Sequence, residues 1–212
     1  MWIRYNERVK ILIATHNSGK LKELQKGLLI LKSLGHEIVS LKDLSIHTEP
    51  EETGSNFQEN SLLKAKYYAR LSQLPTIADD GGLGIHVLNG EPGVKSRRWK
   101  GYDAADEELI QYTLIKLKNY HGNDRSAYLQ TCITFYEPKT KTTFSETEEI
   151  DGYIADIPSK KRIEGYPFRA LFIVKKFNKY YDDLTENEHE EINHRLKAVK
   201  RLAKKIESYL LQ

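Results

Sequence analysis

The chain has a single cysteine, Cys132, among its 212 residues. One cysteine excludes an internal disulfide and any zinc site built from several cysteines, and it fits a reducing compartment. Long apolar runs are also missing, since no stretch approaches the roughly 20 residues of a membrane span. The segment Met1 to Lys10 is polar and charged rather than a signal peptide. We therefore expect a cytoplasmic protein with no membrane partner.

A large excess of charge of one sign is missing as well. The 33 basic residues exceed the 30 acidic ones by only three, which is weak support for nucleic acid as a partner. Hydrophobic residues make up 39% of the chain, enough for one domain with a substantial core and short for two independent ones. We expect a single domain over residues 1–212, in two lobes with no separate linker.

Hydrophobic periodicity predicts an α/β fold. The expected strands are residues 9–15, 37–41, a strand that ends at 79–80, 85–88, 127–136, 142–150, 152–157 and 170–174. The expected helices are 21–31, one from residue 56 that ends before Pro75, 103–119 and 188–211. The polar turn between the first strand and the first helix and the two aspartates at the end of the third strand are the sites that suggest chemistry.

Asp79 and Asp80 end an apolar strand, and Gly81 and Gly82 follow as a predicted turn. Paired carboxylates at a strand end can hold a metal ion or a water molecule. An ordinary acidic turn explains the same residues, because Asp and Gly are both turn formers. Neighbouring side chains of a strand point to opposite faces, so we expect only one of the two aspartates to face a site directly.

The turn between the first strand and helix has the parts of a phosphate cradle: a helix N-terminus with hydroxyl, amide and ammonium side chains. These side chains are Thr15, Asn17, Ser18 and Lys20. It is not the common P-loop, because Ala14 replaces the first glycine and Leu21 replaces the metal-binding Ser or Thr. A plain helix cap with a solvated Lys20 is the alternative.

An acidic loop is a second source of carboxylates. Glu49, Glu51 and Glu52, together with the paired aspartates, offer the ligands that Mg²⁺ prefers, which are a few carboxylates with waters and substrate phosphates. The histidines other than His194 show no metal-ligand spacing with one another, so we expect no zinc site. They are His16, His36, His47, His86, His121 and His189.

Several motifs together resemble the inosine triphosphate pyrophosphatase family, also described as Ham1-like, whose members hydrolyse modified purine nucleoside triphosphates. The motifs are Thr15-His16-Asn17-Ser18-Gly19-Lys20, Glu51-Glu52-Thr53-Gly54, Phe57, Glu59-Asn60, Lys64-Ala65, Ala78-Asp79-Asp80, Gly82-Leu83, Gly90-Glu91-Pro92-Gly93-Val94, Ser96, Arg98, Asn193-His194-Arg195 and Ala198. Each motif is modest by itself, but they follow the family's order from about Lys10 to Leu202.

The resemblance implies an elongated mixed β-sheet flanked by helices, two lobes with a central cleft, a homodimer, and Mg²⁺-dependent release of pyrophosphate from a nucleoside triphosphate. Thr15, Asn17 and Lys20 would bind the phosphates. Glu51 would help to hold the metal, with Asp79 as a possible further ligand. Asp80 would bind the metal and act as the catalytic general base for the attacking water.

The resemblance also implies the substrate-binding residues outside the phosphate cradle. They are Gly81, Tyr166, Phe168, Arg169, Lys179, His194 and Arg195. Tyr166 or Phe168 would stack on the base, and His194 with Arg195 would read a base oxygen. Arg169 replaces the family's aspartate, and Gly81 replaces its usual serine. Because a guanidinium donates where a carboxylate accepts, the base preference is open.

Three functions therefore remain open. The first is hydrolysis of ITP, XTP and their deoxy forms. The second is the same fold with another base preference, or a nucleotide-binding or sensing protein with weak catalysis, which Arg169 and Gly81 suggest. The third, ranked last, is nucleic-acid binding through Lys95, Arg97 and Arg98 and the basic C-terminal helix, which the acidic residues oppose.

Overall fold

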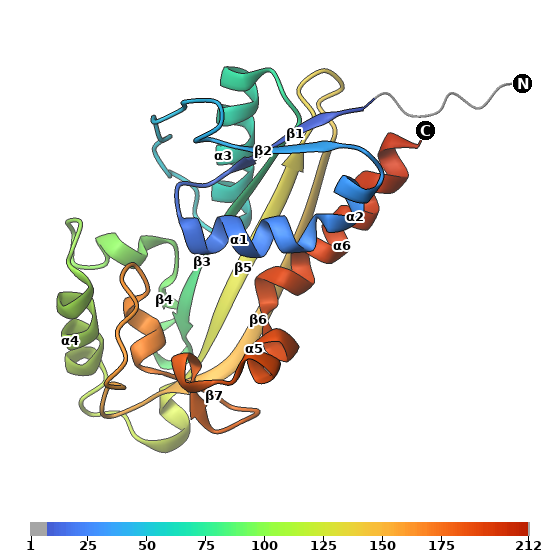
Figure 1. Ribbon diagram of the computed structural model, residues 1–212. Helices are drawn as coiled ribbons and strands as arrows, with labels where there is room; N and C mark the ends of the chain where they lie inside the picture. The colour runs from blue at the N-terminus through green and yellow to red at the C-terminus, as the bar shows by residue number, and fades with distance from the viewer. Residues whose placement is uncertain (1–7, 212) are drawn as a thin grey trace, which may run out of the picture. The chain divides into compact units, whose positions relative to one another are not determined.

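The computed structural model describes residues 8–211, which form a mixed α/β fold (Figure 1). They divide into two compact units. Unit 1 comprises residues 8–80, 131–148 and 195–211, and unit 2 comprises residues 81–130 and 149–194. The segment Met1 to Lys10, predicted to be no signal peptide, lies largely outside the described residues, as does residue 212.

The described strands pair in one sheet with the order β2-β1-β3-β5-β6-β7-β8, and β4 pairs with β3. The strands are β1 (Lys10–Ala14), β2 (Glu37–Ser40), β3 (Thr76–Ile85), β4 (Glu91–Pro92), β5 (Ser126–Tyr136), β6 (Thr143–Ile154), β7 (Phe172–Val174) and β8 (Lys179–Tyr180). β1 is parallel to β2 and β3, whereas the pairs β3–β4, β6–β7 and β7–β8 are antiparallel. The predicted mixed sheet is confirmed.

Six α-helices lie along the described chain. They are α1 (Ser18–Gly27), α2 (Leu29–Ser33), α3 (Phe57–Ser72), α4 (Asp106–Lys116), α5 (Glu186–Ile192) and α6 (His194–Leu210). Short 3₁₀ helices connect the elements of unit 2: η1 (His86–Leu88), η2 (Gly93–Arg98), η3 (Gly122–Arg125), η4 (Pro167–Ala170) and η5 (Tyr181–Asp183). The helix predicted to start near residue 56 is confirmed, with the Asn56 side chain accepting from the Glu59 backbone N–H as its cap.

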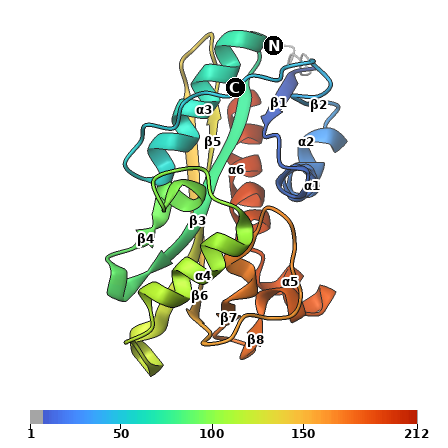
Figure 2. The same ribbon diagram turned by 90° about the vertical axis from the view of Figure 1, so that its left-hand side faces the viewer.

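In unit 1 the alternation of side chains along β1 builds two cores. Ile11 and Ile13 pack in one cluster with Leu24 of α1 and the apolar residues of α6. Leu12 lies in the other cluster with Tyr68 of α3. Figure 2 shows the same arrangement, with α3 on one side of the strands and α1, α2 and α6 on the other. The strand is apolar on both faces because helices cover both.

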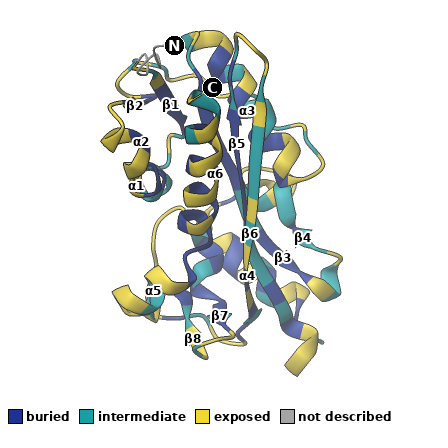
Figure 3. Ribbon diagram, turned by 90° about the vertical axis from the view of Figure 1, so that its right-hand side faces the viewer, coloured by how far each residue is buried: buried dark blue, intermediate teal, exposed yellow. Residues whose placement is uncertain are grey.

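Helix α6 buries one stripe and exposes the opposite one, as Figure 3 shows. Val199 and Ile206 are fully buried, whereas Lys200 and Lys204 are exposed. Helix α1 packs closely against this stripe: a Cβ on Gly27 would lie 2.0 Å from Val199 Cγ1. These basic residues therefore form the solvated face of a core helix.

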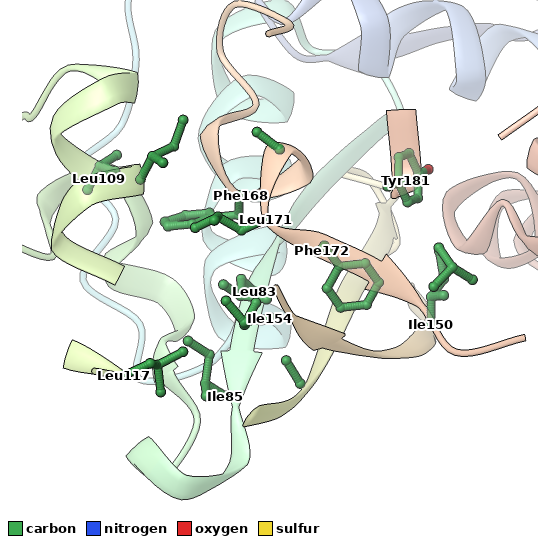
Figure 4. Close-up of a cluster of buried hydrophobic side chains, with 14 of the residues drawn as sticks. Leu83, Ile85, Leu109, Leu117, Ile150, Ile154, Phe168, Leu171, Phe172 and Tyr181 are labelled. Atoms are coloured by element: carbon green, nitrogen blue, oxygen red, sulfur yellow. The ribbon is translucent and has the colours of Figure 1, made fainter. Parts of the chain in front are cut away.

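Unit 2 has its own core, in which residues of β3, α4, η4, β6 and β7 pack together. Figure 4 shows this cluster, with Leu83 and Ile85 of β3 beside Phe168, Leu171 and Phe172. The strand that carries the paired aspartates therefore continues into unit 2, where its last residues are core residues.

This continuation corrects two predictions. The strand does not end at Asp80 with a glycine turn; β3 runs through Gly81 and Gly82 to Ile85. Residues 86–88 form the 3₁₀ helix η1 rather than a strand. Gly84 has a different reason to be glycine, because a Cβ there would lie 2.2 Å from the Tyr128 ring. The turn preference of Asp and Gly gave the wrong prediction here, because cationic partners, described below, stabilise the aspartates inside the sheet.

Three other predicted boundaries were wrong. The stretch 21–31 is two helices that meet at Leu28. The stretch 188–211 is also two helices, because Asn193 leaves the helical conformation with a ψ of 98°. The two strands predicted over 142–157 are one, β6. The apolar periodicity continues across each of these points, although α5 and α6 pack in different clusters, Ile192 in that of unit 2 and Val199 in that of unit 1.

Within residues 8–211, none of the helices has the length and apolar character that a membrane span requires. The predicted absence of a membrane partner rests on the sequence argument.

Candidate active site

The site forms where β3 crosses the middle of the unit 1 sheet. Asp79 and Asp80 are successive residues of this strand, so their side chains point to opposite faces. Asp79 meets groups from α1 and α6, and Asp80 meets a group from α3. The two carboxylates differ in their surroundings and both are buried, with 2% and 7% of their surface exposed; that only one of them faces a bound substrate stays a prediction.

Asp79 is surrounded by donors. Lys20 Nζ lies 2.7 Å from its Oδ2, Arg195 Nε lies 3.1 Å from its Oδ1, and the Thr131 hydroxyl also donates to Oδ1. Burial alone would raise the pKa of Asp79, but the charges of Arg195 and Lys20 outweigh it and hold the pKa far below its usual range. Each oxygen faces a cation, Oδ2 as an ion pair without hydrogen-bond geometry, so Asp79 belongs to the internal charge network, which argues against the predicted ligand role.

Asp80 is less fully satisfied. Lys64 Nζ lies 3.3 Å from its Oδ1, while its buried Oδ2 has no hydrogen-bond partner among residues 8–211. Burial raises the pKa of Asp80, and the charges of Lys64 and Lys20 only partly oppose this rise. A carboxylate with a raised pKa and one free oxygen is suited to accept a proton or bind a cation.

The turn after β1 forms the N-terminus of α1. The Asn17 side-chain oxygen accepts from the Lys20 backbone N–H at 3.0 Å, and the Thr15 hydroxyl oxygen accepts from the Asn17 backbone N–H at 3.2 Å. Ser18 is exposed in the first turn, which contains no acidic residue. The helix-cap interpretation holds for Asn17, but Lys20 is paired with Asp79 rather than solvated. Phosphate binding by this turn stays a prediction.

The acidic loop approaches Asp80 through Glu52. Lys64 Nζ lies 2.5 Å from Glu52 Oε1 as well as 3.3 Å from Asp80 Oδ1, so one ammonium bridges the two carboxylates. Glu51 is exposed. The loop ends at Gly54, whose N–H donates to the buried Asn60 side chain at 2.7 Å. The structure thus brings Glu52 into the site, and the predicted ligand role of Glu51 stays untested.

Arg195 and His194 are both buried at the start of α6. Besides Asp79, Arg195 binds Glu23 of α1, with Nη1 2.6 Å from Oε2. Arg195 thus bridges two carboxylates inside unit 1 and ties α6 to α1 and β3. These contacts give Arg195 a role in the charge network, which differs from the predicted contact with a base oxygen.

In unit 2 the predicted base-reading segment forms a stacked arrangement. The Arg169 guanidinium lies 4.3 Å from the Tyr166 ring centroid and 4.2 Å from that of Tyr181. Its Nε lies 4.0 Å from the carboxylate of Asp182, whose side chain is only 3% exposed. Cation–π contacts with two rings therefore hold the charge that replaces the family's aspartate.

Three other predicted substrate residues differ in exposure: Phe168 is buried, Gly81 is partly buried and Lys179 is exposed. Phe168 is buried in the unit 2 core with its ring 6.3 Å from that of Trp99, which argues against stacking on a base. Lys179 Nζ lies 2.6 Å from Glu188. Gly81 is a partly buried residue within β3.

Some of the basic residues proposed for nucleic-acid binding are paired with acidic ones. Arg97 binds Asp103 and Asp106 at 3.2 and 3.0 Å. On α6, Arg201 binds Glu146 and Glu148 at 2.7 and 2.5 Å. Paired charges give little of the counterion release that drives binding to a phosphate backbone. The structure therefore gives no support to the nucleic-acid alternative.

A metal ion fits this site only with help from a substrate. Residues 8–211 contain no group of three or more His, Cys, Asp or Glu side chains placed to hold a metal. Mg²⁺ commonly binds one or two carboxylates and takes its other ligands from waters and phosphates. The unpartnered Asp80 Oδ2 and the nearby Glu52 meet this smaller requirement.

Sequence reasoning assigned no role to Lys64, Glu23 or Thr131, although all three contact the paired aspartates or their partners. The position of Lys64 could have been predicted, because Lys64 lies four residues after Asn60, another residue of the family motifs, and therefore on the same face of α3. Glu23 and Thr131 gave no comparable signal, since their contacts are with residues 172 and 52 positions away.

Comparisons with known proteins agree on one family. The sequence model described as the Ham1 family matches residues 11–205. A dITP/XTP pyrophosphatase of Bacillus subtilis is 36% identical over 197 residues, covering 93% of this chain and 96% of that protein. One of Haemophilus influenzae is 35% identical over 198 residues, covering 93% and 98%.

Solved structures show the same likeness. The structure of a HAM1 protein from Coxiella burnetii has a TM-score of 0.82 and 33% sequence identity, and the match covers 94% of this chain and 99% of that one. The Ham1 protein of Staphylococcus aureus has a TM-score of 0.80 and 31% identity, with the same coverage.

Proposed function

Because the chain belongs to the Ham1 family, we propose that it is a nucleoside triphosphate pyrophosphatase that hydrolyses dITP, XTP and related modified purine nucleotides to the monophosphate and pyrophosphate. The relatives that bear this activity in their names match more than nine-tenths of the chain. The observation that carries the proposal is the Asp80 carboxylate, which is buried, has a raised pKa and keeps one oxygen without a partner.

Asp80 supplies both functions that such hydrolysis needs from a carboxylate. The Asp80 carboxylate would hold the divalent cation, which we take to be Mg²⁺, and Glu52 or Glu51 of the acidic loop would add a second ligand. When bound, Mg²⁺ offsets the charge of the phosphates and orients the attacking water. Asp80 accepts the proton of that water, for which the raised pKa of this carboxyl group is favourable.

The N-terminus of α1 and Lys20 in its first turn bind the phosphates. A triphosphate carries several negative charges, and the first turn of α1 offers backbone N–H groups with no acidic side chain to repel them. Thr15, Ser18 and Lys20 line this turn. The Lys20 ammonium is held by Asp79 at 2.7 Å, so it meets the substrate already oriented.

For the base we propose that Arg169 does not present its guanidinium to the substrate. The rings of Tyr166 and Tyr181 both lie within 4.3 Å of it, and the Asp182 carboxylate lies beside it. On this basis the exchange of the family's aspartate for Arg169 removes an acceptor without adding a donor to the base. The preference for 6-oxopurines over adenine then depends on other groups.

The proposal has two further parts: the chain forms a homodimer, and it is located in the cytoplasm. Both follow from the likeness to the family and from the composition, and neither depends on the site. Sedimentation of the purified chain measures its mass directly, and a value of one chain mass, 24.6 kDa, would contradict the dimer.

The experiment that tests the activity is pyrophosphate release with Mg²⁺ from the triphosphates of inosine, xanthosine, guanosine, adenosine, uridine and cytidine. We expect release from ITP and XTP and none from Asp80→Asn, whose fold is checked by circular dichroism. Asp103→Asn is the matched control, because Asp103 is 77% exposed and lies in unit 2. Full activity of Asp80→Asn would refute the assignment, and tight binding without release would favour the sensing protein.

A further inference from the structure

Lys64 holds its charge where two carboxylates converge. Its Nζ lies 2.5 Å from Glu52 Oε1, 3.3 Å from Asp80 Oδ1 and 3.4 Å from the backbone oxygen of Asp79. Its side chain is only 17% exposed. A lysine ammonium is charged at neutral pH, so a positive charge occupies the space between the two carboxylates.

The Lys64 ammonium is surrounded by oxygen atoms, and a divalent metal ion such as Mg²⁺ also binds oxygen ligands. The ammonium already lies between Glu52 Oε1 and Asp80 Oδ1, so a metal ion that bound both carboxylates would lie close to it, and two cations cannot share this space without strong repulsion. No larger carboxylate cluster within residues 8–211 offers the metal another position. Binding of one cation to both carboxylates therefore requires the other to leave.

We propose that Lys64 is an internal competitor of the divalent cation, so that the metal binds Glu52 and Asp80 together only after the Lys64 ammonium has moved from between them. This inference rests on the proposed function for the assignment of Asp80 as a metal ligand. A nucleotide phosphate favours the exchange, because it is an alternative partner for the displaced ammonium. Free metal lacks this compensation and binds weakly, so the cation enters efficiently only with the nucleotide.

Binding of Mn²⁺, measured by electron paramagnetic resonance without nucleotide, tests the competition. We expect Lys64→Met to bind Mn²⁺ at least about tenfold more tightly than the wild type, which is a modest part of what Coulomb's law allows for charges about 4 Å apart. Lys66→Met is the matched control. Lys66 lies on the same helix, and its Nζ is over the Tyr136 ring at 5.9 Å, so this variant loses the same charge outside the site.

The result that overturns the proposal is Mn²⁺ affinity in Lys64→Met no higher than in the wild type, or a gain equal to that of Lys66→Met. Lys64→Gln keeps a polar side chain of similar length and gives the same comparison if Lys64→Met does not fold. Adding Glu52→Gln to Lys64→Met must remove most of the gain; an unchanged affinity would show that Glu52 is not a ligand and would also overturn the proposal.

This binding assay is independent of turnover. Failure of the proposed function appears as no pyrophosphate release by the wild type, whereas failure of the competition appears as unchanged Mn²⁺ affinity. With nucleotide present, the proposal further predicts that the advantage of Lys64→Met in Mn²⁺ affinity shrinks, because the wild-type ammonium then has phosphate oxygens to bind.

Discussion

Replacing Arg195 by methionine should destabilise the protein strongly. The Arg195 side chain is 6% exposed and bridges Asp79, which is fully buried, and Glu23, which is 19% exposed. Removing one partner of a buried ion pair costs about 3–5 kcal/mol, because the other charge stays buried. Asp79 keeps Lys20 at 2.7 Å, and Glu23 can be partly hydrated. We therefore expect a loss at the lower end, about 3 kcal/mol.

The measurement is urea unfolding followed by far-ultraviolet circular dichroism at neutral pH. Arg201→Met is the control, because Arg201 lies on the same helix and also binds two carboxylates, but its side chain is 43% exposed. Exposed pairs contribute roughly 0–1 kcal/mol each. Adding Asp79→Asn to Arg195→Met should cost less than the sum of the two single losses, since both single losses include the same Arg195–Asp79 ion pair.

A loss of less than about 1 kcal/mol, equal to that of the control, would refute the reasoning. It would mean that Arg195 is not needed by the internal network. In that case the contact with a base oxygen implied by the family likeness would regain support. Base specificity of Arg195→Met, measured as the ratio of kcat/KM for ITP and GTP, separates the two roles in any variant that remains folded.

Three further predictions concern other parts of the molecule. Gly27→Ala should lower the unfolding free energy by about 1–3 kcal/mol, because its Cβ would lie 2.0 Å from Val199 Cγ1; an unchanged melting temperature would contradict this contact. Arg169→Met should leave the ITP to GTP ratio of kcat/KM within about twofold while lowering stability by about 1–2 kcal/mol, the worth of two cation–π contacts; a large change in the ratio would place the guanidinium at the base. The two aspartates should act oppositely on stability with pH. Asp79, with a lowered pKa, contributes stability that is present above its ordinary value of 3.8 and lost as the pH falls below it. Asp80, with a raised pKa, contributes stability that is present below 3.8 and lost as the pH rises through its folded-state pKa. Urea unfolding of Asp79→Asn and Asp80→Asn beside the wild type from about pH 3 to 7 measures both slopes, and slopes of the same sign would refute the assignment.

Local patterns predicted most of the elements because each is stabilised by its own residues. The apolar run of β1 and the Asn56 cap of α3 each have a local cause. The predicted glycine turn after Asp80 failed because the rule that charges and glycines end strands ignores distant partners. Arg195, 116 positions from Asp79, keeps that carboxylate inside the sheet.

The candidate site was predictable in its anchors and not in its connections. The sequence by itself determined that paired aspartates follow an apolar strand, that a polar turn precedes the first helix, and that the motifs follow a family order. Only the tertiary structure decided which aspartate joins the internal charge network and which one keeps an unpartnered oxygen. Because successive strand residues face opposite helices, Asp79 meets Lys20 and Arg195 while Asp80 meets Lys64. The direction of a side chain along a strand is set by the local backbone, but the charged residues that lie on each face of the strand depend on how the whole chain folds.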